Sequence, residues 1–422
     1  MSETDALFER LWHGEAGLED WTQAVAGGSL DEVADGIAAI STGYLFGNVT
    51  AIRTGEGLVL IDTGSRETAH QTLAALRKWD QRPVHTVIYT HGHIDHTWGA
   101  RVLDEEADRI GVPRPRIVAH RNVLRRFDRY DRTHGLNTFV MGRQFNQPDY
   151  TFPTDHRRPD QVYDGSLSLN IGGVQFDLHH GRGETDDATF VWLPQTKVLA
   201  SGDFVIWVFP NAGNPRKVQR YAPDWSAVLT DMHDLSPDVL IPGHGPAVKD
   251  RVRAAQVLGE GARILDDIES QTIALMNEGC DLNTILQRVR APADLLKKSY
   301  LRARYDDPAF VARSIWHLYA GWYDGNPSHL KPVADAELGA EIAALAGGVE
   351  RLAERAEDLN AQGQPYLAAA LIEFAVAANP NGKNLHRIRA VIYASCVGAE
   401  TSLIGKALFS VPMRESQKIS SG

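Results

Sequence analysis

The first 250 residues of the chain alternate between short apolar runs of strand length and longer runs with helical spacing. Apolar runs at Tyr44–Arg53 and Leu58–Asp62 are separated by a turn with two glycines. Helical spacing over Glu67–Trp79 then precedes another strand-like run, Val84–Thr90. Further strands are predicted at Leu167–Ile171, Val174–His179, Thr189–Leu193, Val198–Ser201 and Val239–Ile241. This alternation indicates an α/β fold for this part of the chain.

The pattern changes to a period of 3.6 residues from about Arg251, where Ala254 and Val257 lie on roughly one helical face. An aromatic-rich stretch follows, which we interpret as core: Tyr300, Tyr305, Phe310, Trp316, Tyr319, Trp322 and Tyr323. Helices are predicted beyond Pro332 at Ala336–Leu345, Val349–Gln362, Pro365–Ala377 and Lys383–Ser395. The pattern alone leaves open whether this half is a partner surface or only a helical subdomain.

Composition narrows the class of protein. A chain of 422 residues can form two domains, and 43 Lys+Arg against 54 Asp+Glu give a net charge of -11, which argues against non-specific nucleic-acid binding. Two cysteines, Cys280 and Cys396, argue against a disulfide framework and fit a reducing compartment. The acidic N-terminus leads into no apolar signal segment, and no apolar run reaches the length of a membrane span. We therefore expect a cytoplasmic protein that binds neither nucleic acid nor membrane.

The strand predicted at Val84–Thr90 ends in a cluster of potential metal ligands. Three histidines and an aspartate fall within the six residues His91-Gly92-His93-Ile94-Asp95-His96. Imidazole nitrogens and carboxylate oxygens suit zinc and similar divalent ions. If the chain stays extended, His91 and His93 point the same way, because side chains alternate along a strand. Asp95 and His96 follow where the chain turns towards a helix, so they could reach a second ion.

One histidine cluster cannot complete two metal sites, so further ligands are expected at the ends of later strands. Glu184, Asp203 and His244 each follow a predicted strand, and glycines on both sides of His244 would let the backbone approach an ion closely. Each of the three could instead be a turn residue or a helix N-cap. His179 and His180 remain rival ligands, since they also lie at a strand end.

The order of these residues along the chain resembles the metallo-β-lactamase superfamily over roughly residues 40–250, and the histidine motif is the most specific part of the resemblance. Asp62, in Ile61-Asp62-Thr63-Gly64, stands where the superfamily has a carboxylate that orients a ligand histidine. Glu184 stands where most members have a third histidine, and this glutamate is a feature of the alkylsulfatase-like branch. Asn211 and Arg216 stand about where that branch places its sulfate-binding residues. One departure is Asp203, where the branch usually has a glutamate.

The resemblance implies a fold and a domain organisation. Residues 1–255 would form the αββα sandwich of the metallo-β-lactamase fold. Residues 256–422 would form an all-α domain similar to the branch's dimerisation domain, so we expect a homodimer.

The resemblance also implies a set of metal ligands. The first ion would be bound by His91, His93 and Glu184, with Asp203 bridging to the second ion. The second ion would be bound by three further residues: Asp95, His96 and His244. Two zinc ions are expected, with iron or manganese as alternatives.

The expected activity follows from this dimetal centre. A hydroxide between the two ions would attack a small anionic ester, with an alkyl sulfate ester as the favoured substrate. Asp95 and Asp203 would be the catalytic carboxylates, while Asn211 and Arg216 would bind the substrate. Lys217, Arg220 and Tyr221 could assist Arg216 in binding an anion, or each could be a solvated surface residue. A carboxylic ester, lactone or phosphoester hydrolase on the same centre, or a di-iron oxygenase, remain the alternatives.

Overall fold

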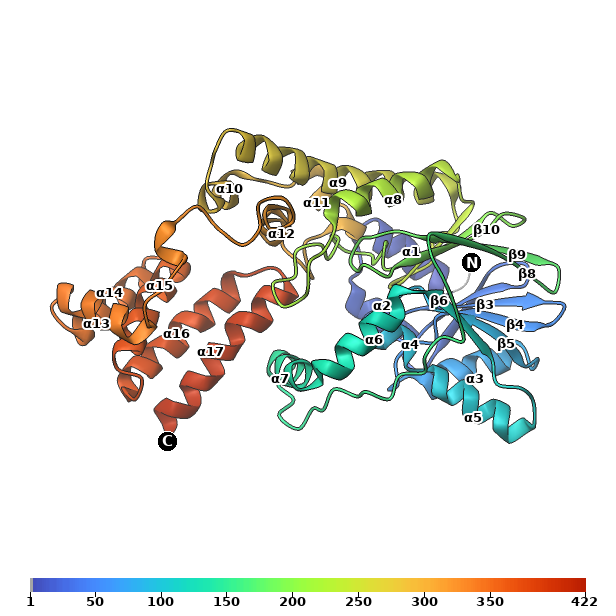
Figure 1. The fold of residues 1–422 in the computed structure, drawn as a ribbon, viewed down its shortest axis with the longest axis horizontal. Coiled ribbons are helices and arrows are strands. Elements are labelled where there is room, and N and C mark those ends of the chain that lie inside the picture. Colours follow the sequence, from blue (N-terminus) through green and yellow to red (C-terminus); the bar gives the residue numbers. More distant parts are fainter. Residues whose placement is uncertain (1–2) are drawn as a thin grey trace.

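The structure is a computed structural model that describes residues 3–422 (Figure 1). Two β-sheets pack face to face in its first part. The larger sheet has the strand order β1-β2-β3-β4-β5-β6-β7. Its strands are β1 Ser29–Ala34, β2 Ile37–Ser41, β3 Val49–Thr54, β4 Gly57–Ile61, β5 Val84–Ile88, β6 Arg116–His120 and β7 Gln161–Tyr163. The smaller sheet has the order β12-β11-β10-β9-β8. Its strands are β8 Ser166–Ile171, β9 Val174–His180, β10 Thr189–Leu193, β11 Val198–Gly202 and β12 Val239–Pro242.

Helices cover the outer faces of both sheets, which gives the four layers of an αββα sandwich (Figure 1). Ile52 and Val59 of the larger sheet share a buried cluster with Phe176 and Val191 of the smaller sheet, so the main core lies between the sheets. Helices α3 (Ala69–Trp79), α5 (Ala100–Ile110) and α6 (Asn122–Arg132) pack on the larger sheet. Every residue of β4 is buried, because this strand has protein on both faces. The predicted α/β sandwich is confirmed.

The predicted strands after residue 55 agree with the structure to within two residues. The strand predicted at Tyr44–Arg53, however, begins only at Val49. Residues 43–48 instead form an irregular loop, in which the Tyr44 carbonyl oxygen accepts a hydrogen bond from His244. The apolar pattern of Tyr44, Leu45 and Phe46 was therefore wrongly interpreted as strand.

The helical half begins with α9 (Arg251–Asn277), which packs along α8 (Ala222–Asp234). One continuous buried cluster extends from Phe190 of β10 through both of these helices to α12 (Pro308–Ala320). The remaining elements of this part of the helical half are α10 Leu282–Arg288, α11 Ala293–Leu296, η1 Ser299–Leu301 and η2 Pro327–His329. The boundary predicted between residues 255 and 256 falls inside α9, and the division into two folding units stays a prediction.

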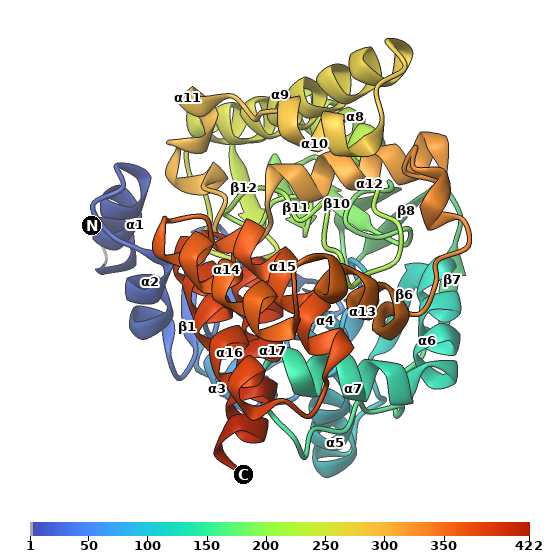
Figure 2. The same ribbon diagram turned by 90° about the vertical axis from the view of Figure 1, so that its left-hand side faces the viewer.

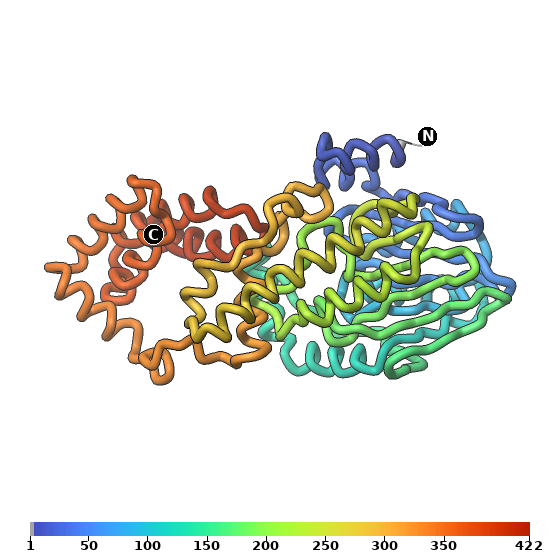
Figure 3. Tube along the Cα trace, turned by 90° about the horizontal axis from the view of Figure 1, so that it is seen from above, coloured from blue at the N-terminus to red at the C-terminus, as the bar shows by residue number. Residues whose placement is uncertain are grey.

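A helical bundle with its own buried core forms the far end of the molecule (Figures 1 and 3). Its helices are α13 Asp335–Leu345, α14 Val349–Ala361, α15 Pro365–Ala378, α16 Lys383–Ala399 and α17 Leu403–Ser421. Four of these agree closely with the predicted helices, while α17 was not predicted. The bundle reaches back to the sandwich where α17 lies beside α7 (His134–Gln144), as Figure 2 shows. There Arg414 Nη2 donates to the Arg143 carbonyl oxygen at 2.7 Å.

The aromatic-rich stretch is only partly core. Tyr300 and Trp316 are buried, as predicted, but Tyr319 and Trp322 are 53% and 66% exposed. The interpretation as core was wrong for both: Tyr319 lies on an exposed face of α12, and Trp322 follows the end of this helix at Ala320.

Two short helices, α1 (Glu3–Trp12) and α2 (Leu18–Val25), precede the sandwich, and both cysteines are free thiols. Within residues 3–422, no helix combines the length and the apolar character needed to cross a membrane.

Candidate metal centre

The predicted ligands meet where several strands end. Asp62 follows β4 and His91 lies just beyond β5, and these two strands are parallel neighbours. Asp203 and His244 follow β11 and β12, which are parallel neighbours in the other sheet. Because parallel strands end at the same edge of a sheet, both sheets deliver polar side chains to one place.

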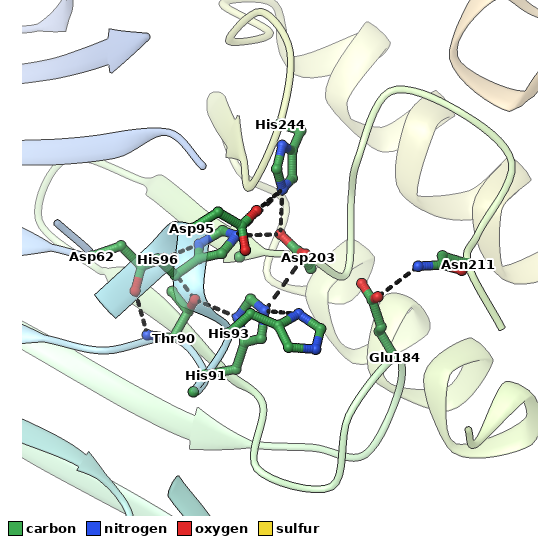
Figure 4. A network of polar contacts seen from close by, with 12 residues as sticks. Asp62, Thr90, His91, His93, Asp95, His96, Glu184, Asp203, Asn211 and His244 are labelled. Carbon is green, nitrogen blue, oxygen red and sulfur yellow. Dashed lines mark hydrogen bonds and ion pairs between the residues drawn. The ribbon is translucent and has the colours of Figure 1, made fainter. Parts of the chain in front are cut away.

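The first group of potential ligands consists of His91, His93 and Asp203 (Figure 4). Their ligand atoms all lie within 4.8 Å of one another. His91 Nε2 lies 2.9 Å from His93 Nδ1 and 3.5 Å from Asp203 Oδ2. The two histidines therefore point the same way, as the sequence predicted, although they follow the strand rather than belong to it.

The second group consists of Asp95, His96 and His244, again with ligand atoms within 4.8 Å of one another. Asp95 and His96 belong to the short helix α4 (Ile94–Thr97), so the predicted turn towards a helix is confirmed. His244 Nε2 lies 3.3 Å from His96 Nε2 and 3.3 Å from Asp95 Oδ2. This half of the site thus joins a helix next to the larger sheet with a loop from the smaller sheet.

Asp203 lies between the two groups (Figure 4). Its Oδ2 faces His91, while its Oδ1 lies 3.1 Å from His96 Nε2 and 3.4 Å from His244 Nε2. Burial alone would raise the pKa of Asp203, but the imidazoles of His96 and His244 hold it well below its usual range. Gly243 permits this arrangement, since a Cβ there would lie 2.1 Å from Asp203 Oδ1. One carboxylate therefore presents one oxygen to each group.

The donor atoms fit two divalent cations. Pairs of imidazole nitrogens face each other at 2.9 Å and 3.3 Å, and only a proton or a cation can satisfy two lone pairs that converge in this way. Burial lowers the pKa of His91 and of His93, which favours the neutral imidazoles that metal binding requires. Nitrogen and carboxylate donors together suit zinc, iron or manganese.

Hydrogen bonds behind the second group fix its histidines. His96 Nδ1 donates to Asp62 Oδ2 at 2.8 Å, and Thr90 holds the same carboxylate through its backbone N–H at 2.7 Å. His244 Nδ1 donates to the Tyr44 carbonyl oxygen at 2.7 Å. Each histidine is thereby held with Nε2 directed into the site. Asp62 therefore makes the contact that its predicted orienting role requires, and the role itself stays a prediction.

Sequence reasoning missed Asn48, which clamps the loop that carries His244. Its Nδ2 donates to the carbonyl oxygens of Pro242 at 3.0 Å and Gly245 at 2.8 Å. Its backbone N–H donates to the Gly243 carbonyl oxygen at 2.7 Å. A lone asparagine at the start of a strand carries no sequence signal for this role, because its partners lie nearly 200 residues away.

Glu184 lies beside Asp203 but belongs to neither group of ligand atoms among the described residues (Figure 4). Its Oε1 accepts a hydrogen bond from Asn211 Nδ2 at 2.6 Å and forms an ion pair with Arg220 Nη1 at 2.5 Å. Burial raises the pKa of Glu184 despite the adjacent Arg220 guanidinium, and the nearby Asp203 carboxylate adds to the rise. A cation between the two carboxylates would relieve their repulsion.

The two residues expected to bind substrate, Asn211 and Arg216, have different hydrogen-bond partners. Asn211 is buried and directed at Glu184, whereas Arg216 donates through Nη1 to the Val140 carbonyl oxygen of α7 at 3.1 Å. Lys217 is exposed to solvent. The pKa of its ammonium group is nevertheless lowered to about 8, because nearby protein atoms displace part of its water and because the Arg220 guanidinium repels its charge. A cation that combines solvent access with such surroundings can meet an incoming anion.

The rival ligands His179 and His180 lie away from the site. His179 stacks on Phe190 with ring centroids 4.9 Å apart. His180 stacks on His120 with centroids 3.6 Å apart, and its Nδ1 is bonded to the Ala188 carbonyl oxygen. Neither histidine joins a ligand group in the described part of the chain.

Comparison with known proteins connects this geometry to a family. The model of the metallo-beta-lactamase superfamily matches residues 42–244, and the model described as alkyl sulfatase dimerisation matches residues 281–418. A linear primary-alkylsulfatase from a Pseudomonas species is 28% identical over 360 residues, which cover 80% of this chain and 68% of that protein. An (R)-specific secondary-alkylsulfatase from Pseudomonas is 27% identical, covering 81% of this chain and 56% of that protein.

The fold agrees with these matches. The solved structure of the stereoselective inverting sec-alkylsulfatase Pisa1 from Pseudomonas superposes with a TM-score of 0.76 at 24% identity. The superposition covers 93% of this chain and 66% of that one. This chain likewise spans 68% and 56% of the length of the two alkylsulfatases named above. The chain belongs to the metallo-β-lactamase superfamily, in the alkylsulfatase branch that carries a dimerisation domain.

Proposed function

We propose that this protein hydrolyses alkyl sulfate esters with two metal ions held by the His/Asp/Glu cluster. The observation that carries the proposal is the position of Asp203, which presents one carboxylate oxygen to each group of ligands. Relatives with alkylsulfatase names align over about four fifths of the chain and support sulfate as the leaving anion. Water would add across the ester to give an alcohol and inorganic sulfate.

Two bound divalent ions would supply Lewis acidity and lower the pKa of a water molecule at the site. His91, His93, Glu184 and Asp203 would hold the first ion, for which Glu184 keeps Oε2 free while Asn211 and Arg220 occupy Oε1. The second ion would be held, together with Asp203, by Asp95, His96 and His244. Zinc is the metal we propose, with iron or manganese as alternatives.

The carboxylates of the site have distinct roles in this proposal. Asp203 is 9% exposed in its side chain and is enclosed by imidazoles, so it holds the site together. Asp95 is 25% exposed and is the more accessible carboxylate, so it is the better placed to take a proton from the attacking water.

Cations beside the site would bind the sulfate group. Lys217 forms no side-chain hydrogen bond or ion pair with any residue between 3 and 422, and Glu184 and Asp95 lie close enough to act on its charge. Arg216 has only Nη1 engaged by its backbone partner, which leaves other N–H groups for anion oxygens. Asn211 would contribute mainly through Glu184, because its amide donates there.

Matched esters test this function. The zinc-loaded protein should release sulfate from alkyl sulfates of graded chain length faster than it cleaves phosphate or carboxylate esters of the same alcohols. Metal analysis of the purified protein accompanies the assay, because iron with an oxygen-dependent optical band would support oxygenase chemistry instead. Cleavage of carboxylate or phosphate esters without sulfate release would contradict the sulfatase proposal and support a carboxylic ester or phosphoester hydrolase instead.

We also propose that the chain forms a homodimer through its helical half. The match of residues 281–418 to the alkyl sulfatase dimerisation model supports this proposal. Exposed apolar side chains on the same half, such as Trp322 and Leu345, would be covered in a dimer. Sedimentation of the full-length chain at micromolar concentration should give twice the monomer mass, and a monomer would contradict the proposal.

A further inference from the structure

A fully buried ion pair lies directly behind the loop that carries His91 and His93. Asp187, whose side chain is 0% exposed, accepts hydrogen bonds through Oδ2 from Arg126 Nε at 2.7 Å and from the Gly92 backbone N–H at 3.0 Å. Gly92 is the residue between the two histidines. The peptide that joins two proposed ligands of the first ion is therefore held by a carboxylate 95 residues further along the chain.

The packing around Gly92 is close. A Cβ at this position would lie 2.8 Å from Arg126 Cδ and 3.1 Å from Asp187 Oδ2. The loop consequently rests against both members of the pair, and a larger residue would push it away from them. Since the histidines on either side share this backbone, such a shift would change the direction of both side chains.

A buried ion pair contributes little net free energy to folding, because removing both charges from water offsets most of their attraction. Breaking such a pair is costly, but replacing both charges with apolar groups of similar size is often neutral or stabilising. Although burial raises the pKa of Asp187, the charge and hydrogen bonds of Arg126 outweigh this and keep the carboxylate ionised. An ionised acceptor binds a backbone N–H more strongly than a neutral one does, which suits a role in fixing the loop.

We propose that Asp187 and Arg126 form a positioning pair that orients the His91-Gly92-His93 loop for the first metal ion. Asp187 would act through the Gly92 N–H, and Arg126 would keep Asp187 charged and in place. Neither residue is a member of the ligand groups. The inference rests on the proposed metal site but not on the choice of ester, because the loop must be oriented before any substrate binds.

The test measures metal affinity directly. Chelator competition on the full-length chain would give the affinity of each ion in the wild type, in Asp187→Ala and in the matched control Asp186→Ala. Asp186 pairs with the same Arg126 at 3.0 Å, but its side chain is 35% exposed, and the Gly92 N–H donates to Asp187 instead. We expect Asp187→Ala to weaken one ion by about 10–100-fold and Asp186→Ala to change affinity by less than about threefold.

The weakened ion is identified in chains that retain a single site. With His244→Ala removing the second site, Asp187→Ala should weaken the remaining ion. With His91→Ala removing the first site, it should not. Thermal unfolding of the metal-free variants provides the readout for a purely structural role. Equal weakening of both ions together with a large loss of metal-free stability, or no change in either affinity, would overturn the proposal.

A conservative variant covers the case in which Asp187→Ala does not fold. Asp187→Asn retains one oxygen acceptor for the Gly92 N–H, so it should lose less affinity for the first ion than complete removal of the acceptor would. Unchanged affinity in Asp187→Asn with unchanged affinity in Arg126→Met would also overturn the proposal. A wild-type protein that binds two ions but cleaves no sulfate ester would contradict the proposed function and leave this inference standing.

Discussion

The two halves of the metal site differ in what holds them. The second group is supported within the sandwich, where Asp62 orients His96 and the Tyr44 carbonyl oxygen orients His244. Glu184, beside the first group, is instead held by Asn211 and Arg220, which belong to the long segment between β11 and α8.

That segment rests on the helical half of the molecule. The Gly213 backbone N–H donates to Asp306 Oδ2 at 2.7 Å, and Gln219 Nε2 donates to the Ser314 carbonyl oxygen at 3.0 Å. The Phe209 N–H donates to a carbonyl oxygen of the same half at 3.0 Å. The second ion site therefore depends only on contacts within the sandwich. The Glu184 side of the site depends in addition on how the helices of the second half pack.

Removing the residue shared by both halves should have the largest effect. Asp203→Ala should lower the bound metal towards one ion per chain and reduce turnover by at least about 10³-fold, because both ions lose an oxygen ligand. Metal analysis and kcat with the best sulfate ester check this expectation. Retention of two ions with near-normal activity would remove Asp203 from the bridging position.

Arg216 tests the part of the site that depends on the helical half. Arg216→Lys keeps the charge but loses the planar fork that can bind two oxygens at once. Activity on an anionic ester should fall by roughly 1.5–3 kcal/mol of transition-state binding, the value of a charged hydrogen bond. Metal content should not change, because Arg216 is not a proposed ligand. An unaltered kcat/KM would exclude Arg216 from substrate binding.

Asp62 tests the sandwich-supported half in isolation. Asp62→Asn weakens the hydrogen bond that His96 Nδ1 donates, so the second ion should bind about 10–100-fold more weakly while the first ion is unaffected. Chelator competition separates the two affinities. In the double variant with Asp187→Ala, each ion should lose the same affinity as in the corresponding single variant, because the two changes act on different ions. Loss of the first ion in Asp62→Asn alone would show that the halves are not independent.

Asp306 gives the smallest expected effect on activity, within about twofold, because it touches neither group of ligands. It is fully buried and accepts backbone N–H bonds from Gly213 and Asp307, and burial raises its pKa to about 7 despite these bonds and the nearby Arg220. Since the folded pKa lies above that of the unfolded chain, its contribution to stability is present below about pH 4 and is lost as the pH rises through about 7.

The unfolding free energy measured in denaturant across this range provides the test. Its decline should have a slope on the order of 1 kcal/mol per pH unit from Asp306, and Asp306→Asn should flatten the decline. The exposed Asp335→Asn is the matched control and should leave the slope unchanged. Equal slopes in the wild type and Asp306→Asn would show that Asp306 does not titrate in this range.

The sequence predicted most strands and four of the five helices of the terminal bundle, because a period of two or 3.6 is a local property. It failed at Tyr44–Phe46, whose apolar side chains suggested a strand, and at Tyr319 and Trp322, which lie on the surface. In both regions the conformation follows from distant partners or from the end of a helix, which short-range periodicity does not contain.

The candidate site divides in the same way. The spacing of His91, His93, Asp95 and His96 predicted a metal centre without any structure, because all four side chains belong to one segment of six residues. Only the tertiary structure decided that Asn211 is directed at Glu184 and that Asp187 holds the Gly92 peptide. Motifs record ligands that are close along the chain, whereas the groups that orient those ligands come from residues brought together only when both sheets and the helices pack.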